Sequence, residues 1–67
     1  MRTIIVNGNI IEWEDNLNIT GVLRKMNYTF RMLVIKVDGQ LVRKSDYDTT
    51  LVPAGANVEV IHLISGG

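Results

Sequence analysis

The chain has 67 residues, of which 46% are hydrophobic, one is proline and none is cysteine. This length predicts a single domain over residues 1–67, with a well-patterned core, because so small a domain buries only about 60% of its unfolded surface. The lack of cysteine excludes disulfides, cysteine-based zinc sites and a persulfide on a side chain. Seven basic residues balance seven acidic ones, which argues against binding to nucleic acid or anionic membranes.

Neither a membrane span nor a secretion signal is evident in the sequence. No apolar run approaches the roughly 20 residues that cross a bilayer. The opening residues Met1–Ile4 do not lead into the long apolar stretch of a signal peptide. We therefore expect a cytoplasmic domain, and one too small to build an enzyme active site of its own.

Two β-hairpins are predicted from apolar strand pairs that flank tight-turn dipeptides. They are residues 2–6 with 9–13 around Asn7-Gly8, and residues 32–37 with 40–43 around Asp38-Gly39. Asn-Gly and Asp-Gly supply the two positive-φ positions that a two-residue hairpin turn requires. Both strand pairs are therefore expected to be antiparallel.

A short helix is predicted between the two hairpins. Apolar residues recur there with helical spacing, at Ile19, Val22, Leu23 and Met26. Asn18 can cap the first turn, and Asn27 can end the helix in a left-handed conformation. Gly21 costs about 1 kcal/mol relative to alanine inside a helix, so this helix must be held by packing its apolar stripe on a sheet.

The order of the elements predicts the fold. Residues 44–56 are polar and read as a surface loop with one helical turn, anchored by Leu51 and Val52. Residues 58–64 form a last strand that is apolar on both faces, which indicates a central place in the sheet. If this strand lies parallel to the first, the intervening chain carries the helix over one face. We therefore predict an α+β, β-grasp (ubiquitin-like) mixed sheet, with one main helix packed on one face and a protruding C-terminal Gly-Gly tail.

The polar residues do not form a recognisable catalytic or metal-binding pattern. His62 stands alone in the last strand, without the second histidine or the cysteines of a metal site, and is interpreted as a structural or partner-contacting residue. The acidic residues at 12–15 and 46–48 lack the cleft of an acid–base pair and the ligand spacing of a calcium loop. We predict no catalytic residue and no metal site in this chain.

The C-terminal glycines are the most informative feature of the sequence. Glycine has no β-carbon, so Gly66 and Gly67 form a thin strip that can enter a narrow channel in another protein. The terminal α-carboxylate, with a pKa of about 3.5, is ionised at neutral pH and can attack the α-phosphate of ATP to give an acyl-adenylate. Gly67 is therefore the candidate modified residue, and Ile64, Ser65 and Gly66 would thread into a partner's active site. A frayed terminus is the alternative interpretation.

An apolar docking patch is expected on the sheet, because one short helix cannot cover both of its faces. We place this patch on the exposed side of Val58, Val60 and Ile64. A partner enzyme would contact the chain there.

The chain resembles the ThiS/MoaD group of small ubiquitin-like sulfur carriers over its whole length. The likeness rests on Asn7-Gly8, the helix at 19–26, Val37-Asp38-Gly39-Gln40, the loop at 53–58 and the final Ile64-Ser65-Gly66-Gly67. Within the group it is most similar to ThiS, the sulfur carrier of thiamin biosynthesis. Molybdopterin-synthase small subunits tend to be longer and often carry a proline before the final glycines. Gly21 and the connector at 28–31 fit neither branch.

The resemblance implies a role as a cosubstrate and not as an enzyme. The Gly67 carboxylate would be adenylated with ATP and magnesium by a ubiquitin-activating-like adenylyltransferase of the ThiF type. Sulfur from a cysteine desulfurase persulfide would make a thiocarboxylate, which would donate its sulfur to a thiazole synthase of the ThiG type. The chain itself would bind no cofactor. The alternatives are the small subunit of molybdopterin synthase, a ubiquitin-like interaction module and a protein modifier.

Overall fold

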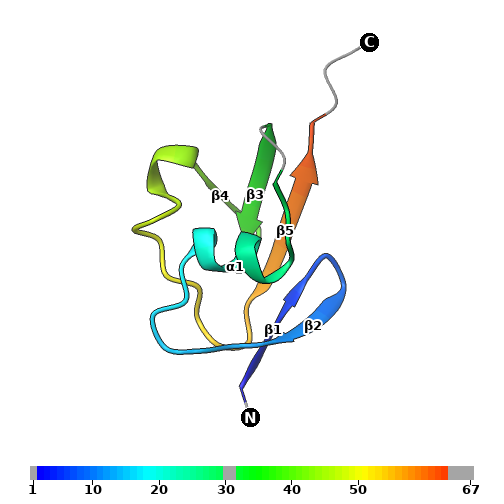
Figure 1. Cartoon of the computed structure of the whole chain (residues 1–67), viewed down its shortest axis with the longest axis vertical. Coiled ribbons are helices and arrows are strands. Elements are labelled where there is room, and N and C mark those ends of the chain that lie inside the picture. Colours follow the sequence, from blue (N-terminus) through cyan, green and yellow to red (C-terminus); the bar gives the residue numbers. More distant parts are fainter. Residues whose placement is uncertain (1, 30–31, 64–67) are drawn as a thin grey trace.

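A computed structural model describes residues 2–29 and 32–63, which form one sheet with a helix across it (Figure 1). In chain order the elements are β1 (Thr3–Val6), β2 (Asn9–Glu12), α1 (Ile19–Lys25), β3 (Leu33–Val37), β4 (Gln40–Val42), a 3-10 turn (Lys44–Asp46) and β5 (Asn57–His62). The strand order is β2-β1-β5-β3-β4. β1 and β5 pair in parallel, and the other neighbours pair antiparallel. The predicted β-grasp order, with the last strand in the centre of a mixed sheet, is confirmed.

Both hairpin turns have the backbone that the sequence predicted. Asn7 and Gly8 have φ values of 50° and 82°, and Asp38 and Gly39 have φ values of 49° and 85°. Positive φ at both central residues is the type I′ geometry, whose twist matches that of the strands it joins. The first turn therefore brings β2 back beside β1, and the second brings β4 back beside β3.

The helix begins and ends as its caps predict. The side-chain oxygen of Asn18 accepts a hydrogen bond from the backbone N–H of Gly21 at 2.7 Å, and Asn27 follows the helix with a φ of 58°. A β-carbon on Gly21 would lie 3.0 Å from Leu17 Cδ1 and 3.2 Å from Asn18 Oδ1. Glycine at position 21 therefore leaves room for the cap, which explains a residue that opposes helix formation.

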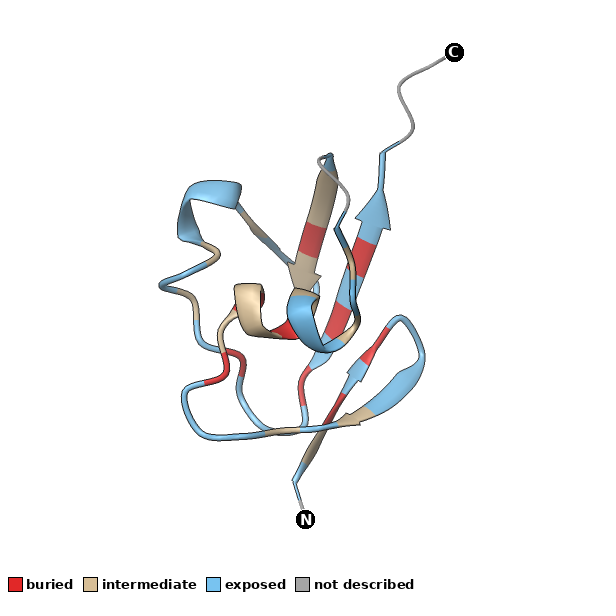
Figure 2. Cartoon of the chain, viewed as in Figure 1, coloured by how far each residue is buried: buried red, intermediate tan, exposed pale blue. Residues whose placement is uncertain are grey.

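The core lies between α1 and the face of the sheet that it covers (Figure 2). Its buried hydrophobic residues are Ile4, Val6, Leu17, Ile19, Val22, Ile35, Val52, Ala56, Val58 and Val60. The predicted loop anchor is half right: Val52 is buried, whereas the side chain of Leu51 is 57% exposed. Val52 is held because its N–H donates to the carbonyl of Leu17 and its carbonyl accepts from the indole of Trp13, both at 2.7 Å.

Candidate functional site: the C-terminal end of the central strand

The end of β5 carries the chain toward the predicted functional tail. On one side β5 pairs antiparallel with β3 from Leu33–His62 to Val37–Val58. The N–H of Leu63 donates to the carbonyl of Met32 at 2.9 Å, so backbone pairing continues past the strand itself. Ile64, Ser65, Gly66 and Gly67 lie outside the described residues, and their roles stay predictions.

On its other side, β5 is supported by a side chain where β1 ends. The N–H of Asn7 donates to the carbonyl of Val58 at 3.0 Å. One residue pair further on, the Asn7 carboxamide accepts from the N–H of Val60 at 2.8 Å and donates to its carbonyl at 3.0 Å. The sequence identified Asn7 only as a turn residue, since nothing in the local pattern shows that a strand distant in the sequence will lie beside it.

The docking patch predicted at Val58 and Val60 is wrong. Val58 is fully buried and Val60 is 8% exposed, because the pairs Val6–Val58 and Ile35–Val60 place both side chains on the face beneath α1. Successive strand residues point to opposite faces, so an error of one residue exchanges core for surface. The charged Glu59 between the two valines was the signal that this strand exposes its odd-numbered residues. Ile64, the third member of the predicted patch, lies outside the described residues.

The exposed apolar surface at this end of the sheet belongs to other residues. Ile61 of β5 is 43% exposed and is paired with Val34 of β3 on the face away from α1. Beside this pair, Leu63 and Met32 are 43% and 51% exposed. We call Met32, Ile61 and Leu63 the strand-end patch. The expectation that one short helix leaves apolar sheet surface uncovered is correct, although its residues are not those predicted.

His62 lies at the end of β5, is exposed, and is paired in register with Leu33. The structural or partner-contacting role predicted for it from the sequence stays a prediction. Among residues 2–29 and 32–63, no cluster of three histidine, cysteine or acidic side chains could hold a metal ion.

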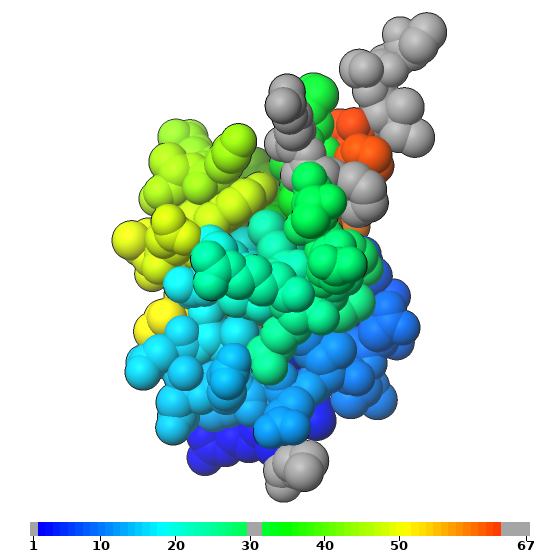
Figure 3. Space-filling view, in the orientation of Figure 1, coloured from blue at the N-terminus to red at the C-terminus, as the bar shows by residue number. Residues whose placement is uncertain are grey.

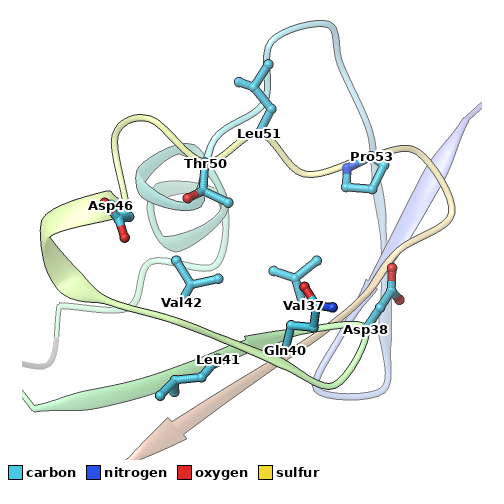
Figure 4. Close-up of a pocket in the computed structure, with 9 residues that line it drawn as sticks. All are labelled: Val37, Asp38, Gln40, Leu41, Val42, Asp46, Thr50, Leu51 and Pro53. Atoms are coloured by element: carbon cyan, nitrogen blue, oxygen red, sulfur yellow. The ribbon is translucent and has the colours of Figure 1, made fainter.

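A pocket of about 480 Å³ lies away from the strand end, between β4 and the loop at 46–53 (Figure 4). Its carboxylates, Asp38 and Asp46, stand at opposite ends of the pocket and so do not form the close pair that acid–base chemistry uses. Asp38 is moreover engaged, since its carboxylate accepts from the N–H of Asn57 at 2.9 Å. Nearby in the same loop, burial raises the pKa of the Tyr47 phenol above its ordinary value. The pocket carries no recognisable catalytic group.

The space-filling view shows α1 and its flanking loops covering one face of the molecule (Figure 3).

In the part of the chain that the structure describes, no helix has the length and apolar character to cross a membrane.

This geometry defines a class: a β-grasp domain whose central last strand leads toward a Gly-Gly sequence. The family model of the ThiS family matches residues 2–67. The chain therefore belongs to the ThiS family, as the resemblance in the sequence indicated.

Two solved structures share this fold over almost all of the chain. The crystal structure of the thiamine biosynthesis protein (ThiS) from Geobacter metallireducens is 24% identical, has a TM-score of 0.78, and is matched over 97% of this chain and 99% of that one. An NMR solution structure of a thiamine biosynthesis protein from the same organism is also 24% identical. Its TM-score is 0.73, with 97% of this chain and 87% of that one covered. At this identity the two structures support the fold.

Proposed function

We propose that this chain is a sulfur carrier for thiazole formation in thiamin biosynthesis, with Gly67 as the residue that holds the sulfur. The observation that carries the proposal is the match to the ThiS family over residues 2–67, a range that includes Gly66 and Gly67. The absence of cysteine from the sequence agrees with it, since the proposal places the sulfur on the C-terminal carbonyl and not on a side chain.

The proposed chemistry takes place on the α-carboxylate of Gly67. The carboxylate attacks the α-phosphate of ATP, pyrophosphate leaves, and an acyl-adenylate forms. The outer sulfur of a partner's persulfide then attacks the carbonyl carbon and displaces AMP, which gives an acyl disulfide. A second thiol of the partner attacks the sulfur that stays on the partner, forms a disulfide with it, and releases the thiocarboxylate. Because glycine has no side chain, the carbonyl carbon is open to each nucleophile.

The partner enzymes supply the catalytic machinery in this proposal. ATP and magnesium bind to a ThiF-type adenylyltransferase, and a ThiG-type thiazole synthase receives the sulfur. The chain binds no cofactor and acts in the cytoplasm as a cosubstrate. What it contributes is a rigid base for the tail, since β5 is paired with β3 on one side and with β1 and Asn7 on the other.

We further propose that the strand-end patch, and not Val58 and Val60, is the surface that the partners contact. Its residues are apolar and exposed, and Leu63 comes directly before Ile64 in the sequence. Burial of apolar surface is the dominant favourable term in most protein–protein association.

Intact-mass spectrometry tests the proposed function. The protein is incubated with ATP, a ThiF-type enzyme, cysteine and a cysteine desulfurase, and we expect the mass to rise by the difference between a sulfur and an oxygen atom. The C-terminal peptide should carry this change, and a variant that lacks Gly66 and Gly67 should not acquire it. Sulfur transfer to thiazole synthase, compared with transfer to molybdopterin synthase, then decides between the two pathways. If several such activating enzymes leave the mass unchanged, the chain is not a sulfur carrier.

A further inference from the structure

The Asn7 carboxamide occupies the place where a backbone peptide group of β1 would otherwise lie. β1 ends at Val6, and the chain turns away at Asn7 with a φ of 50°. β5 continues for four residues beyond Val58, the last residue that it pairs with β1. Without another partner, the N–H and carbonyl of Val60 would be unpaired on this side.

Unpaired peptide groups at Val60 would be costly, because this residue is only 8% exposed. A buried backbone group without a hydrogen bond costs about 1–3 kcal/mol. A carboxamide has a donor and an acceptor side by side, as a peptide group has, and Asn7 uses both on Val60, at 3.0 and 2.8 Å. The second hydrogen of the same amide points to the hydroxyl of Tyr28, 3.4 Å away, in the segment that follows α1.

We propose that Asn7 is the positioning residue for the reactive tail. We call its two hydrogen bonds to the backbone of Val60 the clamp. The clamp extends the β1 side of the sheet by one residue and keeps the end of β5 aligned where it delivers residues 64–67 to a partner. This inference rests on the proposed function for its purpose, whereas the clamp itself rests on the contacts of Asn7. The role belongs to the side chain of Asn7, beyond the turn geometry that Asn7-Gly8 also provides.

The other hairpin contains a matched control. Asp38 is the first residue of the second type I′ turn, with a φ of 49°, and its carboxylate accepts from the N–H of Asn57 at 2.9 Å. Its own N–H donates to the carbonyl of Asn57 at 2.8 Å. Asp38 thus clamps the start of β5 as Asn7 clamps its later part. Asn7→Gly and Asp38→Gly each remove one clamp and keep a turn that glycine adopts without strain.

Amide hydrogen exchange tests the clamp independently of any enzyme. In Asn7→Gly we expect the Val60 amide to exchange about tenfold faster, as the loss of one hydrogen bond predicts, with unchanged exchange at Asn57. In Asp38→Gly we expect the Asn57 amide to exchange about tenfold faster, with unchanged exchange at Val60. Wild-type exchange at Val60 in Asn7→Gly would overturn the clamp.

Adenylation tests whether the clamp positions the tail. With a ThiF-type enzyme, we expect Asn7→Gly to lower kcat/KM for the carrier about tenfold, because small displacements of a reacting group are costly. Asp38→Gly should leave it at the wild-type value. Equal losses in the two variants would show a general effect of stability and overturn the positioning role. Failure of the wild-type protein to be adenylated would instead refute the proposed function. Hydrogen exchange at Val60 would still test whether the clamp exists, because it needs no enzyme.

A third variant separates the donor from the shape of the side chain. Asn7→Asp keeps the acceptor for the Val60 N–H but, when ionised, places a carboxylate oxygen against the Val60 carbonyl. Protonation gives the new carboxyl a donor again and removes the repulsion from the Val60 carbonyl, so lowering the pH should raise the protection of the Val60 amide in this variant and leave Asn7→Gly unchanged. Equal behaviour of the two variants across pH would show that the amide donor has no role.

Discussion

At the scale of single residues, the side chain of Asn18 satisfies backbone groups at the start of α1. The side-chain oxygen of Asn18 accepts from the N–H of Gly21 in the first turn of α1, and its amide nitrogen donates to the carbonyl of Asp48 at 3.2 Å. We expect Asn18→Ala to lower the free energy of unfolding by about 1 kcal/mol, as the loss of an N-cap does. Urea denaturation measures this. Asn9→Ala, at an exposed position in β2, is the control, and an equal loss there would contradict the capping role.

Replacing Gly21 with alanine would have two opposed effects on the stability of the protein. Alanine would favour the helix by about 1 kcal/mol, but its β-carbon would lie 3.2 Å from the oxygen that caps the helix and 3.0 Å from Leu17. Because both the cap and a buried side chain must shift, we expect Gly21→Ala to lower the free energy of unfolding. A more stable variant in thermal denaturation would show that helix propensity is the larger effect.

At the scale of elements, the outer face of the sheet places opposite charges across the central strand β5 and its neighbour β3. Lys36 of β3 is directly opposite Glu59 of β5. Glu59→Lys should therefore lower the free energy of unfolding by about 0.2–1 kcal/mol, since like charges directly opposite are unfavourable. The double variant Lys36→Glu, Glu59→Lys should recover most of this loss. Additive losses in a double-mutant cycle would show that the two side chains do not interact.

At the scale of the whole molecule, α1 covers one face of the sheet and leaves the strand-end patch on the other. We expect Ile61→Asp to raise KM about tenfold with a ThiF-type enzyme, because a charge must then be desolvated in the interface. Ile10→Asp is the matched control: Ile10 is 72% exposed on the edge strand β2. Equal KM values for the two variants, both folded by circular dichroism, would place the docking surface elsewhere.

Local patterns in the sequence were sufficient for the elements and their turns. Asn7-Gly8 and Asp38-Gly39 specify their turns by chemistry that acts within four residues, and Asn18 specifies the start of α1 in the same way. Local patterns were not sufficient to predict which face of β5 is buried. That face depends on the registers of β5 with β1 and β3, whose residues are distant in the sequence. Because β5 has apolar residues on both faces, Glu59 is a weak local signal for it.

The sequence by itself determined the order of strands and helix along the chain and the candidate tail at Gly66 and Gly67, because both follow from short-range patterns. Only the tertiary structure decided that Val58 and Val60 are core residues, that Met32, Ile61 and Leu63 are surface, and that Asn7 reaches Val60. The physical reason is the same for all three. Each depends on which strand lies beside β5 and in what register, and that is settled by packing of the whole sheet against α1.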